Sequence, residues 1–349
     1  MNLQEALDKI TPLDEQAMQI CQRRWDNIAK PLHSLGKLED LLIRVAGITG
    51  NQEVPVEKKA LVPMCADNGV VAEGVTQSGQ EVTAIVSENF LKEKATASIL
   101  CKTAGADIFP VDIGVAVDTN IINHKIAYGT KNLAVEWAMS REEAVRSLEV
   151  GIHMVEELKE KGYQVIATGE MGIGNTTTSS AVAAVLLNQP VEEMTGRGAG
   201  LTSAGLQKKI DTIKNAIALH QPNREDAIDV LAKVGGLDIG GIAGMFIGGA
   251  ACHIPIVIDG FISAVGALVA ASICPQVKSY MLSSHVSKEP AAHLILEALE
   301  VSPCLHCDMC LGEGTGAVAF FPLLDLASAV YHGMSNFEQI GVEQYQELK

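Results

Sequence analysis

The sequence predicts an α/β fold in which a parallel sheet is covered by helices, and three observations support this prediction. From residue 58 onward, short apolar runs alternate with alanine-rich helical segments, an order typical of βαβ units. The 349 residues are 48% apolar, so the chain can bury the core of one large or two moderate domains. Its 32 glycines suit a fold with many tight turns between strands and helices.

Two helices are expected at the N-terminus. Four apolar side chains repeat with the spacing of one helix face, namely Leu3, Ala6, Leu7 and Ile10. Pro12 and Asp14 then supply a first-turn proline and a cap for a second helix that extends to about Ala29. Neither helix can bury its apolar face alone, so both must pack against another part of the chain.

Five strands are expected after this helical start. They are the apolar runs Ala60–Ala66, Asp107–Val115, Val165–Ala167, Ile254–Ile258 and Ser279–Leu282. Pro63 and Pro110 lack an N–H group, so we expect the strands that contain them to be edge strands or irregular. Charged helices are expected in an outer layer at residues 141–161 and 206–220, and a more buried one at 317–334.

Charge and composition exclude several classes of function. Lysine and arginine total 26 against 42 aspartates and glutamates, a net charge of −16, and no basic cluster is present to neutralise nucleic-acid phosphates. The first twenty residues contain acids and no long apolar run, unlike a signal peptide. Eight cysteines are too few for a disulfide scaffold in a chain of this length, so we expect free thiols and a cytoplasmic protein.

One apolar stretch, residues 239–277, raises the question of a membrane hairpin. Its single ionised side chain is Asp259, but glycines and prolines interrupt it repeatedly and no excess of lysine or arginine flanks it. It also divides into a helix, a strand and a second helix, at residues 243–252, 254–258 and 262–274. We therefore expect a buried α/β layer and no membrane contact.

A segment rich in glycine and threonine, residues 168–178, follows a short strand and opens a helix. Backbone N–H groups at such a helix start can hold a phosphate, with threonine hydroxyls as caps. The segment lacks the lysine of a triphosphate-binding loop, and Thr177 stands where a dinucleotide-binding loop has its third glycine. ATP and NAD are therefore disfavoured. An ordinary glycine-rich turn without a ligand is the alternative.

Two other glycine-rich turns carry charged side chains. The turn at residues 195–200 precedes a helix with Lys209, and either this lysine or Arg197 is a candidate cation for an anionic substrate; a solvated side chain is the alternative. The turn at residues 311–317 places Glu313 between two glycines ahead of an apolar helix. Partial burial there raises a carboxyl pKa toward the range of a general base, whereas simple helix capping is the alternative.

Two further segments contain candidate ligands. Cys304, Cys307 and Cys310 are spaced by three, with a histidine between them, which suits zinc or an iron–sulfur cluster. No second pair of closely spaced cysteines accompanies them, and buried small side chains are the alternative. The segment Ser283–Glu289 gathers hydroxyls, an imidazole and charges at the end of an expected strand, where parallel sheets place ligands. It suggests a serine hydrolase, but no G-x-S-x-G turn accompanies it.

Several motifs occur together in one order along the chain. They are PLHSLGKLE (31–39), CADNGVVAEGV (65–75), VDIGV (111–115), GEMGIGNTT (169–177), KVGGLDIGGIAG (233–244), IDGFISA (258–264), SSHVSKEP (283–290) and LGEGTGA (311–317). In this order the sequence resembles the nicotinate-nucleotide:dimethylbenzimidazole phosphoribosyltransferase family. The resemblance implies a large Rossmann-like α/β domain over residues 31–317, a small helical domain formed by residues 1–30 and 318–349, and a dimer.

The resemblance also implies a reaction. Enzymes of this family transfer the phosphoribosyl group of nicotinate mononucleotide to an aromatic base in cobamide biosynthesis, giving an α-linked riboside phosphate and nicotinate. Glu313 matches the general base of the family, and Glu170 matches a second carboxylate. The positions that match the 5′-phosphate site are Gly174, Asn175, Thr176, Thr177, Gly198, Lys209 and Ser287. Neither a metal nor a redox cofactor is implied.

Departures from the family pattern lie around the acceptor base. The positions assigned to the base pocket are Asn68, Ser78, Val86 and Leu311. Asn68 replaces a common histidine, and Val86 stands where some members have a glutamine, so an amide donor and acceptor are missing. The acceptor therefore stays open between a benzimidazole-type base and a phenol or p-cresol. The other alternative is a weakly active subunit, and the expected assembly is a homodimer or a heterodimer with a homologous subunit.

Overall fold

The computed structural model describes residues 1–345, and within them a seven-stranded parallel sheet forms the centre of the molecule. The strands follow the order β4-β3-β1-β5-β6-β7, and β2 pairs with the first part of β1. Their bounds are Lys59–Ala66 (β1), Ala106–Ile108 (β2), Val111–Gly114 (β3), Ile122–Asn123 (β4), Val165–Met171 (β5), Ile256–Ile258 (β6) and Met281–Ser283 (β7). The predicted α/β fold with a parallel sheet is confirmed.

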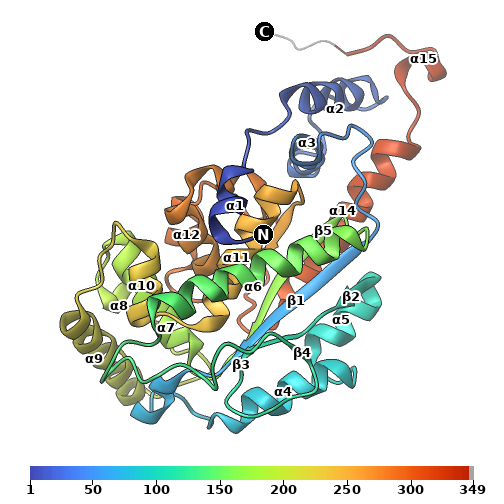
Figure 1. The fold of residues 1–349 in the computed structure, drawn as a ribbon. Helices are drawn as coiled ribbons and strands as arrows, with labels where there is room; N and C mark the ends of the chain where they lie inside the picture. The colour runs from blue at the N-terminus through green and yellow to red at the C-terminus, as the bar shows by residue number, and fades with distance from the viewer. Residues whose placement is uncertain (346–349) are drawn as a thin grey trace.

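Helices cover both faces of this sheet (Figure 1). Residues 1–345 form fifteen α-helices in all, including some that lie away from the sheet. They are α1 (Leu3–Asp8), α2 (Glu15–Asn27), α3 (Lys37–Thr49), α4 (Glu81–Leu91), α5 (Thr96–Ala104), α6 (Arg141–Glu160), α7 (Asn175–Leu187), α8 (Val191–Met194), α9 (Ser203–His220), α10 (Ala227–Val234), α11 (Leu237–Cys252), α12 (Phe261–Ile273), α13 (Ala292–Ala298), α14 (Thr315–Gly333) and α15 (Phe337–Ile340). Short 3₁₀ helices occur at Gly69–Glu73 and Pro275–Tyr280.

Side chains of the central strand alternate between two cores. On β1, Val62 and Met64 face a core shared with α6, α7, α11 and α12. Leu61 and Cys65 face a second core shared with α3, α5 and α14. Every residue of β1 is buried, because a parallel sheet with helices on both faces leaves neither side to solvent.

Pro63 lies in a central strand, so the expectation of an edge strand is wrong for β1. This strand pairs with β5 on one side and with β2 and β3 on the other. The C=O of Leu61 accepts a hydrogen bond from the N–H of Phe109 at 2.8 Å, so Pro63, two residues later, turns its missing N–H to the same side. On that side of β1, Pro110 separates β2 from β3, so the hydrogen bonds between β1 and its neighbours are already interrupted there. Pro63 in β1 and Pro110 in the connection between β2 and β3 thus lie at one irregularity of the sheet, which agrees with the other alternative expected for these strands.

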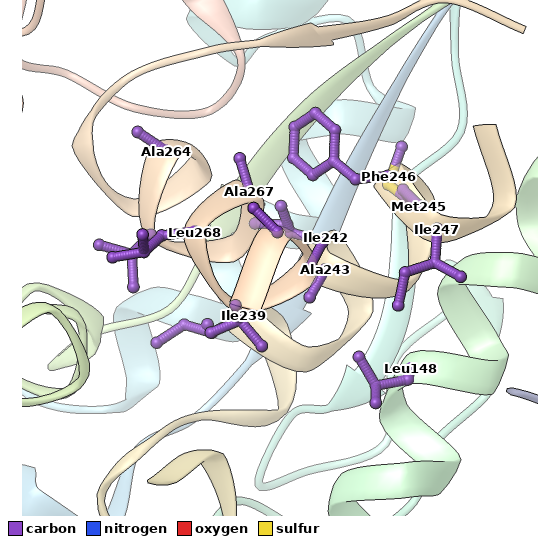
Figure 2. Packing of buried hydrophobic residues seen from close by; sticks show 14 of the residues in the cluster. Leu148, Ile239, Ile242, Ala243, Met245, Phe246, Ile247, Ala264, Ala267 and Leu268 are labelled. Atoms are coloured by element: carbon purple, nitrogen blue, oxygen red, sulfur yellow. The ribbon is translucent and has the colours of Figure 1, made fainter. Parts of the chain in front are cut away.

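The glycine-rich helix α11 is a buried core helix. Figure 2 shows its apolar side chains together with side chains of α6 and α12. A Cβ on Gly244 would overlap the carbonyl oxygen of Leu148, so this glycine lets α6 and α11 approach closely. The stretch at residues 239–277 is the helix, strand and helix expected of it. Within residues 1–345, no helix has the length and apolar character needed to cross a membrane.

The helices from the two chain ends do not all pack on one another. Helix α2 meets the end of α14 through Trp25 and Tyr331, whose ring centroids lie 5.1 Å apart. Helix α3, which falls in the predicted large domain, packs on both, whereas α1 packs on α6 and α11 (Figure 1). We therefore propose a small domain of α2, α3 and the second half of α14. Residues 346–349 of the predicted small domain lie outside the described part of the chain.

Candidate active site

The strand order reverses between β1 and β5, because β3 and β4 lie on one side of this pair and β6 and β7 on the other. At such a point the loops that follow the strands diverge and leave a crevice at their carboxyl ends. A cavity of about 340 Å³ lies there. Its walls come from the segments that follow β1, β5, β6 and β7 and from the segment before α14, around residues 75–78, 170–176, 259–263, 285–289 and 309–315.

Glu170 stands at the end of β5 and forms part of a buried acidic cluster. The side-chain amide of Asn175, in the first turn of α7, donates to Glu170 and also to Oδ2 of Asp238 at 3.1 Å. The pKa of Glu170 is raised to about 8, mainly by burial; the charges of Asp238 and Asp259 contribute to this rise, and the Asn175 hydrogen bond opposes it. Burial likewise raises the pKa of Asp238 to about 6. A cationic or proton-donating group is therefore favoured beside these carboxyl groups.

Glu313 lies in a tight turn between two glycines, residues 312–314, which we call the Glu313 turn. All three residues have positive φ: +92° at Gly312, +60° at Glu313 and +90° at Gly314. A Cβ on Gly312 would overlap Oε1 of Glu170, so glycine is required there. Oε2 of Glu313 accepts the N–H of Ala97 at the start of α5 at 3.0 Å. Burial raises the pKa of this carboxyl, which lines the cavity.

Lys209 brings a positive charge to the other side of the cavity. The residue is 1% exposed, and its Nζ lies 2.8 Å from Oγ1 of Thr176 and 3.2 Å from the carbonyl oxygen of Gly196. Burial lowers its pKa to about 8, while the charge of Glu289 opposes that shift. Helix α7 starts here after Gly174, so its N-terminal turn adds to the positive potential. A buried ammonium group and a helix start together suit a phosphate.

Arg197, the alternative cation, is held by its own turn. Its guanidinium donates to the carbonyl oxygen of Leu201 at 2.8 Å and to Oγ of Ser203 at 3.1 Å. It lines the cavity but is mostly exposed, unlike Lys209.

The structure brings most of the residues singled out from the sequence to one cavity. Those that line it are Glu170, Gly174, Asn175, Thr176, Gly198, Lys209, Ser287, Glu313, Ser78, Val86 and Leu311. Asn68 and Thr177 do not line it, and this corrects their placement. Asn68 is fully buried, with its Oδ1 3.5 Å from Oγ1 of Thr178 and its Cβ behind Gly174. Thr177 is fully buried in the first turn of α7.

The cysteine segment contributes one of its three cysteines to the cavity. Of its three cysteines, Cys310 lines the cavity, Cys307 is exposed elsewhere and Cys304 is partly buried. In the part of the chain described by the structure, no three His, Cys, Asp or Glu side chains gather as metal ligands do. The i, i+3, i+6 spacing therefore does not produce a metal-binding geometry here.

Two buried titratable residues of the cavity were given no role from the sequence, although one of them, His285, lies in the Ser283–Glu289 segment singled out there. Asp259 follows β6 and is 3% exposed, and His285 follows β7 and is 4% exposed. A signal for Asp259 existed, since it is the single ionised side chain of an apolar stretch, and a charge in such a place is rarely buried without a role. His285 shares a motif with Ser287, two residues later, and alternate residues of an extended segment face the same side.

This arrangement suits a substrate with an anionic end and a cationic reacting centre. The ammonium group of Lys209 and the start of α7 are suited to hold the anion, while Glu170 and Glu313 line the other part of the same cavity. Carboxylates in such a position stabilise developing positive charge, and one with a raised pKa can accept a proton.

Known proteins are similar to this chain in both sequence and fold. A family model described as phosphoribosyltransferase matches residues 10–342. The chain is 50% identical to a nicotinate-nucleotide–dimethylbenzimidazole phosphoribosyltransferase of Clostridium acetobutylicum and 49% identical to one of Ruminiclostridium cellulolyticum, with all of each chain covered. A crystal structure of CobT from Thermus thermophilus matches with a TM-score of 0.89 and 36% identity, covering 95% of this chain and 100% of that one. The chain therefore belongs to the nicotinate-nucleotide–dimethylbenzimidazole phosphoribosyltransferase family.

Proposed function

We propose that this protein transfers the phosphoribosyl group of nicotinate mononucleotide to a dimethylbenzimidazole-type base, giving an α-riboside phosphate and nicotinate in cobamide biosynthesis. One observation carries the proposal: a single cavity joins the buried ammonium group of Lys209 at a helix start to the carboxyl groups of Glu170 and Glu313. The names of the relatives agree with it.

The nucleotide binds with its phosphate at Lys209. The 5′-phosphate accepts hydrogen bonds from the ammonium group of Lys209, the hydroxyl of Thr176 and the backbone N–H groups around Gly198. The hydroxyl of Ser287 donates to it from the opposite loop. The ribose and the pyridinium ring then lie toward the acidic end of the cavity. There the positive ring nitrogen is attracted by the carboxyl groups, which compensates their mutual repulsion.

The transfer step needs one general base to accept one proton. A ring nitrogen of the acceptor attacks C1′ while the bond from C1′ to the pyridinium nitrogen breaks, and that nitrogen keeps the electron pair and leaves neutral. The acceptor ring thereby becomes positively charged and must lose its remaining N–H proton. Glu313 accepts this proton, for which its raised pKa is well suited. Glu170 faces the positive charge that develops on the ribose.

The acceptor base lies on the apolar side of the cavity. Ser78, Val86 and Leu311 line this side, together with Met171 and Met309. An apolar wall binds a flat aromatic ring through dispersion and burial. A phenol acceptor is not favoured, because the similar proteins are named for the benzimidazole reaction.

The proposal includes a dimer in the cytoplasm. Ile85, Leu91 and Ile99 are large apolar side chains that are about half exposed on α4 and α5, as at many subunit contacts. The cysteines of the described residues are all free, which fits a reducing compartment.

The test is a product assay with the purified full chain. Nicotinate mononucleotide and dimethylbenzimidazole are expected to give nicotinate and riboside phosphate in equal amounts, resolved by liquid chromatography. Glu313→Gln is expected to lower kcat by about 10²–10⁴-fold, because an amide cannot accept the proton. The matched control is Glu300→Gln, whose side chain is 77% exposed and pairs with Lys278 far from the cavity.

Three outcomes would contradict the proposal. Turnover of p-cresol without turnover of the benzimidazole would identify a phenol-activating enzyme. Nicotinate release that appears only after a homologous chain is added would identify a weakly active partner subunit. Equal kcat in Glu313→Gln and the parent protein would remove the assignment of the base.

A further inference from the structure

Asp259 binds the backbone of the segment that carries Glu313. Its Oδ1 accepts the N–H groups of Gly316 at 2.8 Å and Ala317 at 2.9 Å, and its Oδ2 accepts the N–H of Gly314 at 3.2 Å. These N–H groups belong to the start of α14 and the residue just before it, where no helical carbonyl is available to pair with them. One buried carboxylate from the end of β6 therefore caps a helix that is more than fifty residues away in the chain.

The Glu313 turn needs such support. Three successive residues with positive φ include one with a side chain, Glu313, and such a backbone persists only when its surroundings hold it. On the incoming side, the N–H of Glu313 lies 3.4 Å from Oε1 of Glu170, a long contact. On the outgoing side, the three hydrogen bonds to Asp259 are shorter. Asp259 is thus the main attachment of this turn to the sheet.

We propose that Asp259 is a positioning residue for the reaction: its carboxylate holds the Glu313 turn so that the base faces C1′ and the acceptor. The inference rests on the proposed function, because it presupposes that Glu313 is the base. Asp259 need not touch the reacting atoms, since its oxygens are already engaged by the backbone of α14.

His285 completes the support from the next strand. The hydroxyl of Ser284 donates its single proton to the carbonyl oxygen of Ile258 at 2.6 Å, so Nδ1 of His285, 3.1 Å from that hydroxyl, is the donor to it. The ring fills the space beside Gly316, where a Cβ would overlap it. Its charge interaction with Asp259 opposes the rise that burial causes in the pKa of that aspartate.

Asp259→Asn tests the positioning role of Asp259 with a side chain of the same size and shape. The asparagine oxygen can accept from Gly316 and Ala317, but its amide nitrogen then meets the N–H of Gly314, and two donors face each other. Because Gly314 adjoins Glu313, we expect the base to shift. The expected result is a fall in kcat of about ten- to a hundredfold, with KM for nicotinate mononucleotide changed much less.

The pH profile separates positioning of the base from general damage. The titratable groups that line the cavity wall near Glu313 include Glu170 on β5, Asp259 after β6, His285 after β7 and Cys310 just before the turn, while α5 contributes a backbone N–H group to the Glu313 carboxyl. The charge of Asp259 raises the pKa of both glutamates. Asp259→Asn is therefore expected to move the acid limb of the kcat profile to lower pH, which a merely structural defect would not do.

Two further variants complete the design. Asp259→Glu keeps the charge but displaces the carboxylate by one methylene, so kcat is expected to fall while the acid limb stays in place. Asp226→Asn is the matched control, since Asp226 caps α10 through the N–H groups of Ile228 and Asp229, both at 3.1 Å, away from the cavity. It is expected to leave kcat and the acid limb unchanged.

Hydrogen exchange tests the hydrogen bonds of Asp259 to the start of α14 in the parent protein. This measurement does not depend on whether the variants fold. Peptides covering residues 314–317 are expected to exchange slowly, because the amides of a helix start are protected only when they are capped. Rapid exchange there would overturn the inference. So would parent-like kcat in Asp259→Asn or Asp259→Glu, or a fall in kcat with an unmoved acid limb and an equal loss of nucleotide binding. If the parent protein releases no nicotinate, the proposed function has failed instead.

Discussion

The Nζ of Lys209 lies 2.8 Å from Oγ1 of Thr176, which fixes the buried ammonium group against the first turn of α7. The side chain of Lys209 on α9 and the start of α7 thereby create a positive potential at the same place in a cavity whose other part is lined by carboxyl groups. The cost of burying the ammonium group is visible in its pKa, which burial lowers to about 8. A bound phosphate would compensate this cost.

Lys209→Met is expected to raise KM for nicotinate mononucleotide by about ten- to a hundredfold, because a charge-assisted hydrogen bond contributes about 1.5–3 kcal/mol. In the parent protein, KM is expected to rise as the pH passes about 8, since the ammonium group then loses its proton. The Lys209→Met variant is expected to show no such rise in KM, because methionine carries no titratable group. Initial-rate kinetics between pH 6.5 and 9.5 measure both effects, with the pH values chosen to bracket the pKa at about 8.

The neighbouring Lys208 provides the control for this prediction. It lies on the same helix but is exposed, so Lys208→Met removes the same charge from the protein without emptying the phosphate site. Its KM is expected to match that of the parent. Equal KM values in Lys209→Met and Lys208→Met would show that the phosphate binds elsewhere.

Glu170→Gln is expected to change how stability depends on pH. Burial raises the pKa of Glu170 from 4.5 to about 8, so between these values the folded protein keeps a proton that the unfolded chain has released. The parent therefore loses stability as the pH rises through this window. The variant cannot ionise, and at pH 8.5 it is expected to be more stable than the parent by up to about 5 kcal/mol.

Thermal unfolding at pH 5 and pH 8.5 measures this difference. At pH 5, only half a unit above the ordinary glutamate pKa of 4.5, the ionisation of Glu170 in the unfolded chain costs the folded parent no more than about 1 kcal/mol, so parent and variant are expected to unfold at similar temperatures. Asp238, whose pKa burial raises to about 6, adds a similar loss at lower pH in both proteins and does not distinguish them. Parallel stability profiles for parent and variant would mean that Glu170 is ionised in the folded protein.

The fold was predictable because its strands are short apolar runs separated by alanine-rich helical segments, and both are local patterns. The edge position expected for the strand of Pro63 was wrong, because this proline is tolerated opposite the break at Pro110 between β2 and β3, and neither local sequence shows which segments pair. Similarly, α1 shows an apolar face, but nothing local says that this face packs on α6 and α11 and not on α2.

The site was predictable to the extent that glycine-rich turns follow strands, since those turns meet at one sheet edge. Such turns carried Glu313, Glu170 and Thr176 into the cavity. Motif position does not decide side-chain direction, however. Asn68 follows β1 closely, yet its side chain turns under Gly174 and is buried. Asp259 shows the converse, because its role depends on backbone N–H groups of a distant helix.

Cys310 supplies the last prediction, because it is an exposed thiol in the cavity wall next to Leu311. Alkylation of the parent protein with N-ethylmaleimide is expected to abolish nicotinate release, since the added ring occupies the acceptor side of the cavity. Prior addition of nucleotide and base should slow this loss. Cys310→Ser is expected to resist the reagent while keeping most of its turnover. Cys307→Ser, which removes an exposed thiol outside the cavity, should be inactivated like the parent. Inactivation that persists in Cys310→Ser would place the reactive thiol elsewhere in the chain.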